Sequence, residues 1–236
     1  MTDSPVSYEL RDQVALITLD DGKANAVSHE VAAGLHDALE RAEKEAAAVV
    51  LTGRPGRFSA GFDLATMTSS NDNARELLRV GAEVAIQING LAKPVVVACT
   101  GHALAMGAIL LMAADVRIGA EGSFKIGLNE VAIGIAMPKF VVELGRGCLA
   151  TTELSAALSL ATLYDPEGAV RAGFLDSVVP ADELVDTAIA TATELAGRLH
   201  AGAFTATRQS LRGEQIERAQ HALVADVANF TVDIPS

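Results

Sequence analysis

The chain has 236 residues, of which 50% are apolar, and its formal net charge at pH 7 is −12. This length and composition predict a globular protein that folds as one domain with a helical tail. The acidic balance excludes nucleic acid and anionic membranes as partners, because a surface that binds phosphates needs a basic field.

The first half of the chain alternates strand and helix patterns. Residues 14–19 are β-branched and apolar, which predicts a strand, and Ser28 is a side chain suited to the N-cap of the helix that follows. A second strand is predicted over residues 47–52. Residues 68–73 are polar and lack periodicity, which predicts a mobile loop, and residues 74–91 then fit a long amphipathic helix.

The second half begins with one more strand and then becomes mainly helical. Apolar residues 95–97 predict a strand that breaks at Gly101, where small residues open a helix. The remaining predictions are short strands at residues 115–119, 123–126 and 177–179, helix starts at Pro138, Thr152 and Asp165, and helices over residues 182–199 and 203–229 with a break at Gly213. This order favours an α/β fold with mostly parallel strands and a helical C-terminal part.

Cysteine content and hydropathy indicate the cellular compartment in which the protein works. Two cysteines, Cys99 and Cys148, are too few for a disulfide framework, which favours a reducing compartment. The start of the chain, MTDSPVSYEL, lacks the basic and apolar regions of a signal peptide. No apolar run reaches the roughly 18 to 20 residues that a membrane span needs. We therefore expect a cytoplasmic protein without a membrane span.

Two small-residue turns and one carboxylate carry the candidate chemistry. The break at Gly101 leads into a helix start, where backbone N–H groups have no partner in the helix and can hold a negative charge. The turn FSAGF at residues 58–62 follows another apolar strand and offers a second donor. Glu130 lies among apolar residues in GLNEVAIG, where burial of a carboxylate is costly without a partner or a chemical role, although a surface position fits the spacing equally well. Such a set can move a proton next to a carbonyl group.

These segments also carry a family resemblance. In order and spacing, FSAGFDL, KPVVVACTGHALAMGA, AADVRIGAEGSFKIGLNEVAIGIAMP and AVRAGFLDSVVP are similar to the crotonase (enoyl-CoA hydratase/isomerase) superfamily. The resemblance implies a spiral of repeated ββα units, assembled as homotrimers or hexamers. It implies an acyl-CoA site in a core over residues 1–180. Residues 181–236 would form a C-terminal helical segment for trimerisation and site closure, shorter than is usual in the family.

The resemblance also implies roles for individual residues. The backbone N–H groups of Phe62 and Met106 correspond to the oxyanion hole, and the side chain of Met106, where the family commonly has Gly, is expected to narrow the pocket. Glu130 resembles the catalytic glutamate of mitochondrial-type Δ3,Δ2-enoyl-CoA isomerases. Its pKa is expected to rise toward neutrality against the apolar neighbours Val131, Ile133 and Ile109. Ile109 and Ile133 are predicted to line the acyl pocket.

Ile109 decides which reaction the resemblance implies. Hydratases of the superfamily carry a second glutamate at this position, and the pair activates water, whereas shuttling one proton between two carbons needs one base. The sequence therefore favours an isomerase that shifts a 3-enoyl-CoA double bond to the 2-enoyl position. Two alternatives remain: a 2-enoyl-CoA hydratase with atypical water activation, and a non-catalytic acyl-CoA-binding homologue.

The coenzyme A portion of the substrate has its own candidate residues. Ser59 and Ala60 resemble the segment whose backbone contacts the adenine. Lys23, Arg54 and Arg57 are basic candidates for the phosphates, although such residues are more often solvated loop charges. No tightly bound cofactor is expected, since coenzyme A belongs to the substrate.

Three further residue types have structural interpretations. The histidines and cysteines show no ligand spacing, which predicts no metal site. His102, in a packed turn, is interpreted as structural. Glu143 is expected to pair with Arg146 on one helix face, and remains a reserve candidate for a second acid in the pocket.

Overall fold

The computed structural model describes residues 4–232, so residues 233–236 of the predicted C-terminal segment lie outside the described part. The strands are β1 (Val6–Arg11), β2 (Val14–Leu19), β3 (Ala26–Val27), β4 (Ala48–Gly53), β5 (Gly56–Ser59), β6 (Gly61–Phe62), β7 (Val95–Cys99), β8 (Gly101–Leu104), β9 (Val116–Ala120), β10 (Ile126–Gly127) and β11 (Ser177–Val179). The helices are α1 (His29–Glu45), α2 (Leu64–Met67), α3 (Asn71–Gly90), α4 (Met106–Ala113), the 3-10 helix η1 (Val131–Ile133), α5 (Lys139–Cys148), α6 (Leu154–Leu158), α7 (Pro166–Ala172), α8 (Leu184–Arg198) and α9 (Ala201–Asn229).

The described strands form two main sheets and a separate parallel pair, β3 and β6. The larger has the strand order β1-β2-β4-β7-β9-β11, in which only the pair β1 and β2 is antiparallel. The smaller sheet, β10-β8-β5, is parallel throughout. Each of β4, β7 and β9 is followed by its counterpart in the smaller sheet and then by helices, which is the repeated ββα spiral predicted from the resemblance.

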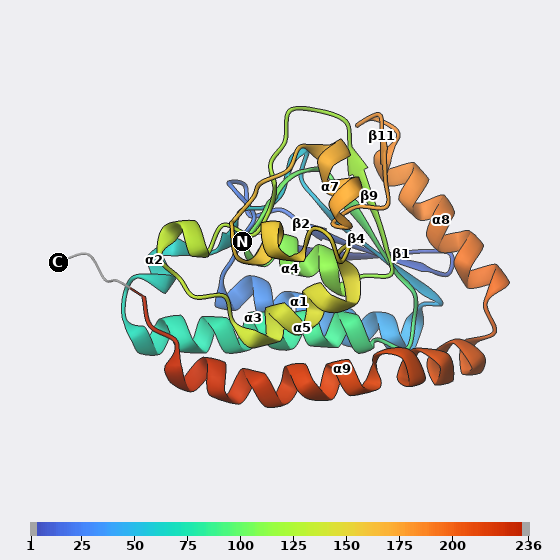
Figure 1. The fold of residues 1–236 in the computed structure, drawn as a ribbon. Helices are drawn as coiled ribbons and strands as arrows, with labels where there is room; N and C mark the ends of the chain where they lie inside the picture. Colours follow the sequence, from blue (N-terminus) through green and yellow to red (C-terminus); the bar gives the residue numbers. More distant parts are fainter. Residues whose placement is uncertain (1–3, 233–236) are drawn as a thin grey trace.

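Helices cover both faces of the larger sheet, as the unbroken apolar runs of its parallel strands require. Alternate residues of β2 show the two sides: Ala15 and Ile17 belong to the main core with α1 and α3, whereas Val14 and Leu16 pack in a second cluster with α8. The long α9 runs beside α3 and also packs on α5 (Figure 1). The C-terminal helices thus lie against the spiral of their own chain.

Local hydrogen bonds explain which helix starts were predicted correctly. Ser28 is the N-cap of α1 and accepts from the Val31 N–H, and Asp165 caps α7 in the same way through Gly168. The predicted start at Thr152 is wrong, because α6 begins at Leu154 after a turn.

Two predicted interruptions are also wrong. Residues 68–73 do not form one loop: Thr68 ends α2, and α3 begins at Asn71 with Ser70 as its N-cap, which accepts from the Asn73 N–H. The predicted break at Gly213 is absent, because α9 continues through this residue, which is buried. A glycine inside a helix costs about 1 kcal/mol, and the packing of α9 on two other helices offsets that cost.

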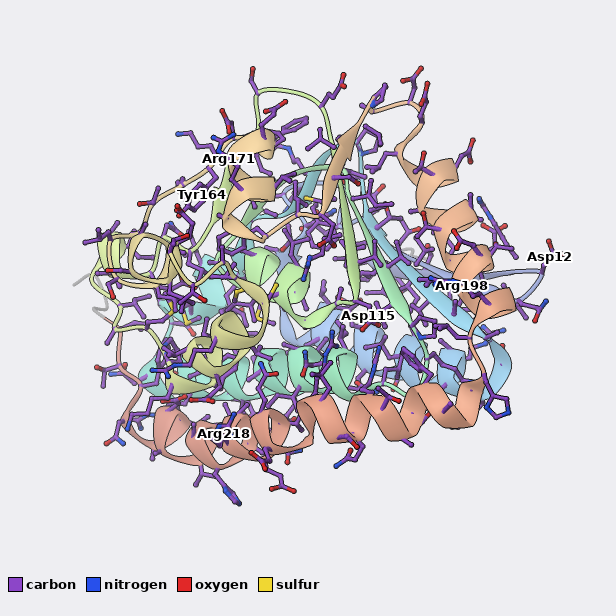
Figure 2. The ribbon with its side chains drawn as sticks, turned by 45° about the vertical axis from the view of Figure 1, so that its right-hand side comes forward. Asp12, Asp115, Tyr164, Arg171, Arg198 and Arg218 are labelled. Atoms are coloured by element: carbon purple, nitrogen blue, oxygen red, sulfur yellow. The ribbon has the colours of Figure 1, made fainter. Side chains whose placement is uncertain are left out.

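A buried ion-pair network fixes the first half of α9. Asp115, at the start of β9, accepts from Arg208 and, at 3.0 Å, from Arg212, and it also accepts from the Val95 N–H at 2.8 Å. Arg208 also donates to the Leu91 carbonyl at the end of α3. Figure 2 shows Asp115 between the sheet and α9. The network ties three segments that are distant in sequence.

Candidate active site

An apolar cavity of about 370 Å³ opens where α2, α3, α4, α5 and η1 converge with the end of α9. Its lining is mostly aliphatic and aromatic, with Asn129 and Glu130 as the polar side chains among the described lining residues. The full lining is Ala60, Phe62, Leu64, Met67, Leu78, Ala105, Ile109, Asn129, Glu130, Ile133, Ile135, Pro138, Val141 and Phe230. A carboxylate in such a wall meets a low dielectric.

Two backbone segments meet at one side of this cavity. A Cβ placed on Gly61 would lie 2.9 Å from the Cβ of Ala105 and 3.5 Å from the nitrogen of Met106, so the segments touch. Met106 is the first residue of α4, and its N–H has no partner within the helix. The N–H groups of Gly61 and Asp63 donate to the Ser59 hydroxyl and the Val27 carbonyl.

The N–H of Phe62 lies between these two donors in sequence. Because successive residues of a strand direct their N–H groups to opposite sides, this N–H is directed away from β3. The two N–H groups predicted as donors, on Phe62 and Met106, therefore belong to adjoining backbone segments beside the cavity.

The turn before α4 is conformationally unusual. Ala105 is the N-cap, with φ 49° and ψ −120°, a backbone conformation that residues other than glycine rarely adopt. Its position is bounded by Gly61 and Gly107, and a Cβ on Gly107 would lie 2.5 Å from the Ser59 carbonyl oxygen. The sequence predicts a helix directly after the break at Gly101, but β8 comes first and α4 begins at Met106.

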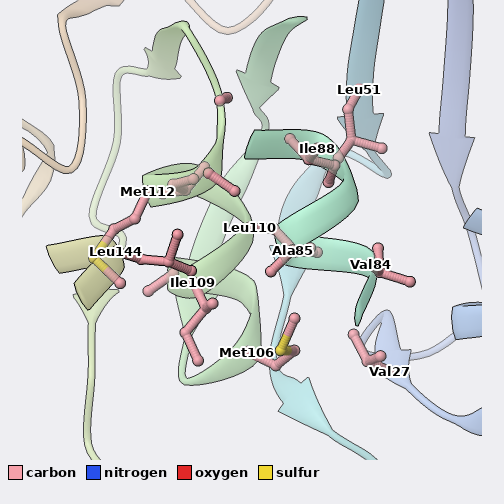
Figure 3. Packing of buried hydrophobic residues seen from close by; sticks show 14 of the residues in the cluster. Val27, Leu51, Val84, Ala85, Ile88, Met106, Ile109, Leu110, Met112 and Leu144 are labelled. Atoms are coloured by element: carbon pink, nitrogen blue, oxygen red, sulfur yellow. The ribbon is translucent and has the colours of Figure 1, made fainter. Parts of the chain in front are cut away.

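The side chain of Met106 does not narrow the pocket, contrary to the prediction. It is fully buried, and its sulfur lies 3.4 Å from a Cβ placed on Gly81 of α3. Figure 3 shows it on the side of α4 that faces Val84 and Val27, away from Leu144. The ring of Phe62 also lies over Gly81, at 2.4 Å from the same Cβ position. The absence of a side chain at Gly81 thus accommodates both residues.

Glu130 is buried, with 8% of its surface exposed, and it starts the η1 turn at the cavity wall. Its Oε2 atom is buried and has no hydrogen-bond partner among the residues that the structure describes. Burial raises the pKa of Glu130 to about 7, although the backbone N–H groups of Asn129 and Glu130 itself oppose the rise. A carboxyl with this pKa can accept and release a proton near neutral pH.

The predicted apolar neighbours of Glu130 divide into two groups. Ile109 and Ile133, the two residues predicted to line the acyl pocket, both line the cavity, and Ile133 is also 56% exposed. Val131 is 41% exposed and does not belong to the lining. The apolar wall around Glu130 therefore includes residues of α3, α5 and α9 but not Val131.

Glu143 is not a second acid of the cavity. It lies on α5, where its carboxylate accepts from Arg218 of α9 at 2.8 Å. The predicted pair with Arg146 is wrong, because α9 brings a closer cation. Arg218 is labelled on α9 in Figure 2.

The coenzyme A candidates gather beside β5. Arg54 donates to the Lys23 carbonyl at 3.1 Å, and the Arg57 N–H donates to the Arg54 carbonyl at 3.0 Å, so the three basic residues share one loop cluster. Ala60 is exposed and lines the cavity. Ser59 is fully buried, and its hydroxyl donates to the Asn25 carbonyl, so it supports the turn from behind.

Sequence reasoning missed several residues that build this site. Asn25 is buried at φ 53°, and its side chain donates to the carbonyls of Leu19, Arg57 and Phe58, which joins the strand ends. The DDGKAN turn, rich in Asp and Asn, is the signal that could have identified it. No local pattern indicates that Phe230 reaches the cavity.

Three further observations concern His102, metal ligands and membrane spans. His102 accepts from the Lys125 N–H at 3.0 Å and packs edge-on against Phe124, in line with its structural interpretation. Within residues 4–232, no group of three or more His, Cys, Asp and Glu side chains is placed to hold a metal ion. Within the same residues, no helix has the length and apolar character needed to cross a membrane.

The fold and the cavity together define a protein of the crotonase type, with a ββα spiral and an apolar cavity that is lined by the buried carboxylate of Glu130. Residues 9–233 match the family described as Enoyl-CoA hydratase/isomerase, and the chain belongs to this family.

Several proteins align with nearly the whole length of this chain. An enoyl-CoA hydratase/isomerase family protein from Pseudomonas syringae is 41% identical, with a TM-score of 0.93 over 96% of this chain and 98% of that one. An enoyl-CoA hydratase from Mycobacterium marinum is 34% identical, with a TM-score of 0.91 over 96% of this chain and 100% of that one. Mouse mitochondrial enoyl-CoA delta isomerase 1 is 30% identical over 92% of this chain and 77% of its own length. Isomerases and hydratases both occur among these relatives.

Proposed function

We propose that the protein is an enoyl-CoA isomerase that converts a 3-enoyl-CoA to the 2-enoyl-CoA by transfer of one proton. The observation that carries the proposal is the single carboxylate, Glu130, among the described cavity-lining residues, with apolar Ile109 where a hydratase of the family would carry its second acid. One base suffices for the isomerisation, because the same proton leaves one carbon and joins another.

The reaction starts with the thioester oxygen held by the N–H groups of Phe62 and Met106. Ionised Glu130 removes a proton from C2, and the electron pair of that C–H bond moves toward the thioester oxygen to form a dienolate. The two donors stabilise this charge, each by about 3 to 4 kcal/mol in comparable oxyanion sites. Glu130 then returns the proton to C4, and the double bond lies between C2 and C3.

Coenzyme A would extend from the cavity toward the basic loop cluster. Ala60 lines the cavity, and Lys23, Arg54 and Arg57 adjoin the strand that leads to it. Arg54 also forms an ion pair with Asp20 at 3.7 Å, so Lys23 and Arg57 are the main candidates for the phosphates on a chain whose net charge is −12. Ser59 holds the turn in place. A cytoplasmic location and assembly as a trimer or hexamer remain predictions.

The test presents a cis-3-enoyl-CoA and a trans-2-enoyl-CoA to the purified protein in parallel, with products identified by chromatography and mass spectrometry. We expect an isobaric 2-enoyl product from the first substrate and no gain of water by the second. Glu130→Gln should bind acyl-CoA but lose turnover, whereas Glu143→Gln, which removes a carboxylate outside the cavity, should retain it.

The alternatives give different results in the same experiment. Hydration of the trans-2-enoyl-CoA would assign the protein to the hydratases. Saturable acyl-CoA binding without product from either substrate would indicate a non-catalytic binding protein. Full turnover by Glu130→Gln would refute the role of this carboxyl group.

A further inference from the structure

Phe230, at the end of α9, separates the active-site cavity from a second hollow of equal volume, about 370 Å³. The second hollow lies between the segment that precedes α5 and the last turn of α9. Ile135, Pro138 and Phe230 line both spaces, and Phe230 is the member of this group that comes from α9. Phe230 is 8% exposed and packs in the main core. Phe230 is thus part of a thin wall between two open volumes.

Hydrogen bonds from neighbouring helices hold this wall in place. Arg75 of α3 donates to the Phe230 carbonyl at 3.1 Å, and Asn71 accepts from the Val232 N–H at 3.0 Å. Before Phe230 in the chain, Asp226 of α9 accepts from the Phe140 N–H at 2.9 Å, which joins α9 to the start of α5. The backbone on both sides of the ring is therefore fixed to α3 or α5.

The proposed chemistry gives the direction of the acyl chain. The thioester would lie beside the backbone N–H groups of Phe62 and Met106, and Glu130 must reach both C2 and C4. Carbons beyond C4 then continue among the apolar side chains of α3, α5 and α9, where Leu78, Val141 and Phe230 line the cavity. At roughly 30 Å³ for each water-sized group, this cavity holds about twelve non-hydrogen atoms of thioester and chain.

We propose that Phe230 is a specificity-determining residue that ends the acyl cavity and limits the substrate to short and medium acyl chains. The proposal rests on the acyl-CoA function proposed above and adds a substrate class to it. Removal of the Phe230 ring would take away the part of this wall that comes from α9 and open a path for the chain toward the second hollow.

The experiment measures dissociation constants for butanoyl-, octanoyl- and hexadecanoyl-CoA by isothermal titration calorimetry. These saturated thioesters have no double bond to move, so binding is measured independently of turnover. The variants are Phe230→Ala and Phe230→Leu, with Val224→Ala as the matched control, since Val224 is a 74% exposed residue of the same helix. Thermal unfolding verifies that each variant is folded.

We expect the wild type to bind octanoyl-CoA more tightly than hexadecanoyl-CoA. Phe230→Ala should improve the affinity for hexadecanoyl-CoA by about tenfold or more, because each newly buried methylene contributes about fourfold. Butanoyl-CoA should bind nearly as before. Phe230→Leu should shift the preference in the same direction by less, so the proposal remains testable if the alanine variant does not fold. Val224→Ala should keep the wild-type preference.

Equal wild-type affinities for octanoyl- and hexadecanoyl-CoA, or an unchanged preference in both Phe230 variants, would overturn the proposal. A shift in chain-length preference without turnover of any 3-enoyl-CoA would support the role of Phe230 and reject the isomerase assignment. Absence of binding to every acyl-CoA would reject both.

Discussion

Replacing Glu130 by Gln should make the protein less active and, above neutral pH, more stable. The pKa of this carboxyl is raised from 4.5 to about 7 by burial in the apolar wall. In the unfolded chain the group ionises near its ordinary value, so between pH 4.5 and 7 the folded state retains a proton that the unfolded chain releases. Folding stability therefore falls as pH rises through this window and is lowest above pH 7.

The magnitude follows from the size of this shift. A change of one pKa unit corresponds to 1.36 kcal/mol, so raising the pKa of Glu130 from 4.5 to about 7 costs the folded state about 3 kcal/mol when the group is ionised. Between pH 5 and pH 8, roughly 2 to 3 kcal/mol of this cost develops. For a chain of this size, that difference corresponds to a melting-temperature change of roughly 5 to 10 °C.

The assay compares urea or thermal unfolding of wild type and Glu130→Gln at pH 5 and pH 8, together with turnover of a 3-enoyl-CoA across the same range. The wild type should lose more stability than the variant as pH rises, while its kcat/KM should increase through pH about 7 as Glu130 ionises. The variant should lose roughly a hundredfold or more in turnover. Parallel stability curves for the two proteins would refute a desolvated, titrating Glu130.

Three other substitutions test the packing around the site. Gly81→Ala places a Cβ 2.4 Å from the Phe62 ring, which should displace the segment that carries the Phe62 N–H. We therefore expect kcat/KM to fall in steady-state kinetics while the variant remains folded. Ala105→Gly relieves the backbone at φ 49° and should raise the free energy of unfolding by about 1 kcal/mol in urea denaturation; a loss of stability would contradict the inferred strain. Arg208→Met removes one of the two cations that pair with Asp115 and should lower the free energy of unfolding by about 1.5 to 3 kcal/mol, whereas an unchanged melting temperature would show that this ion pair contributes nothing.

Features set by neighbours in sequence could be predicted from the sequence. The caps at Ser28 and Asp165 depend on side chains and N–H groups three residues apart. The burial of Glu130 is different, because Val131 and Ile133, which follow it in sequence, are exposed, and the cavity wall around it comes from distant helices. The polar segment at residues 68–73 contains the same kind of signal as these caps, because Ser70 is an N-cap, but its polar composition alone predicts a loop.

Features set by contacts between distant segments could not be predicted in this way. The direction of the Met106 side chain depends on the space over Gly81, which belongs to another helix. Glu143 pairs with Arg218 rather than with Arg146, because α9 folds back onto α5. Phe230 reaches the cavity for the same reason, since the path of α9 depends on tertiary packing.

The position of α9 late in the chain affects synthesis on the ribosome. Helices α3 and α5, which α9 covers, are complete by residue 148, whereas α9 begins only at residue 201. At about 5 to 20 residues per second, the nascent chain spends roughly 3 to 10 seconds with these two helices made and their cover not yet translated. During that interval the apolar surfaces under α9 are available to chaperones and to neighbouring nascent chains. Protection from aggregation is therefore needed most before residues 201–229 emerge.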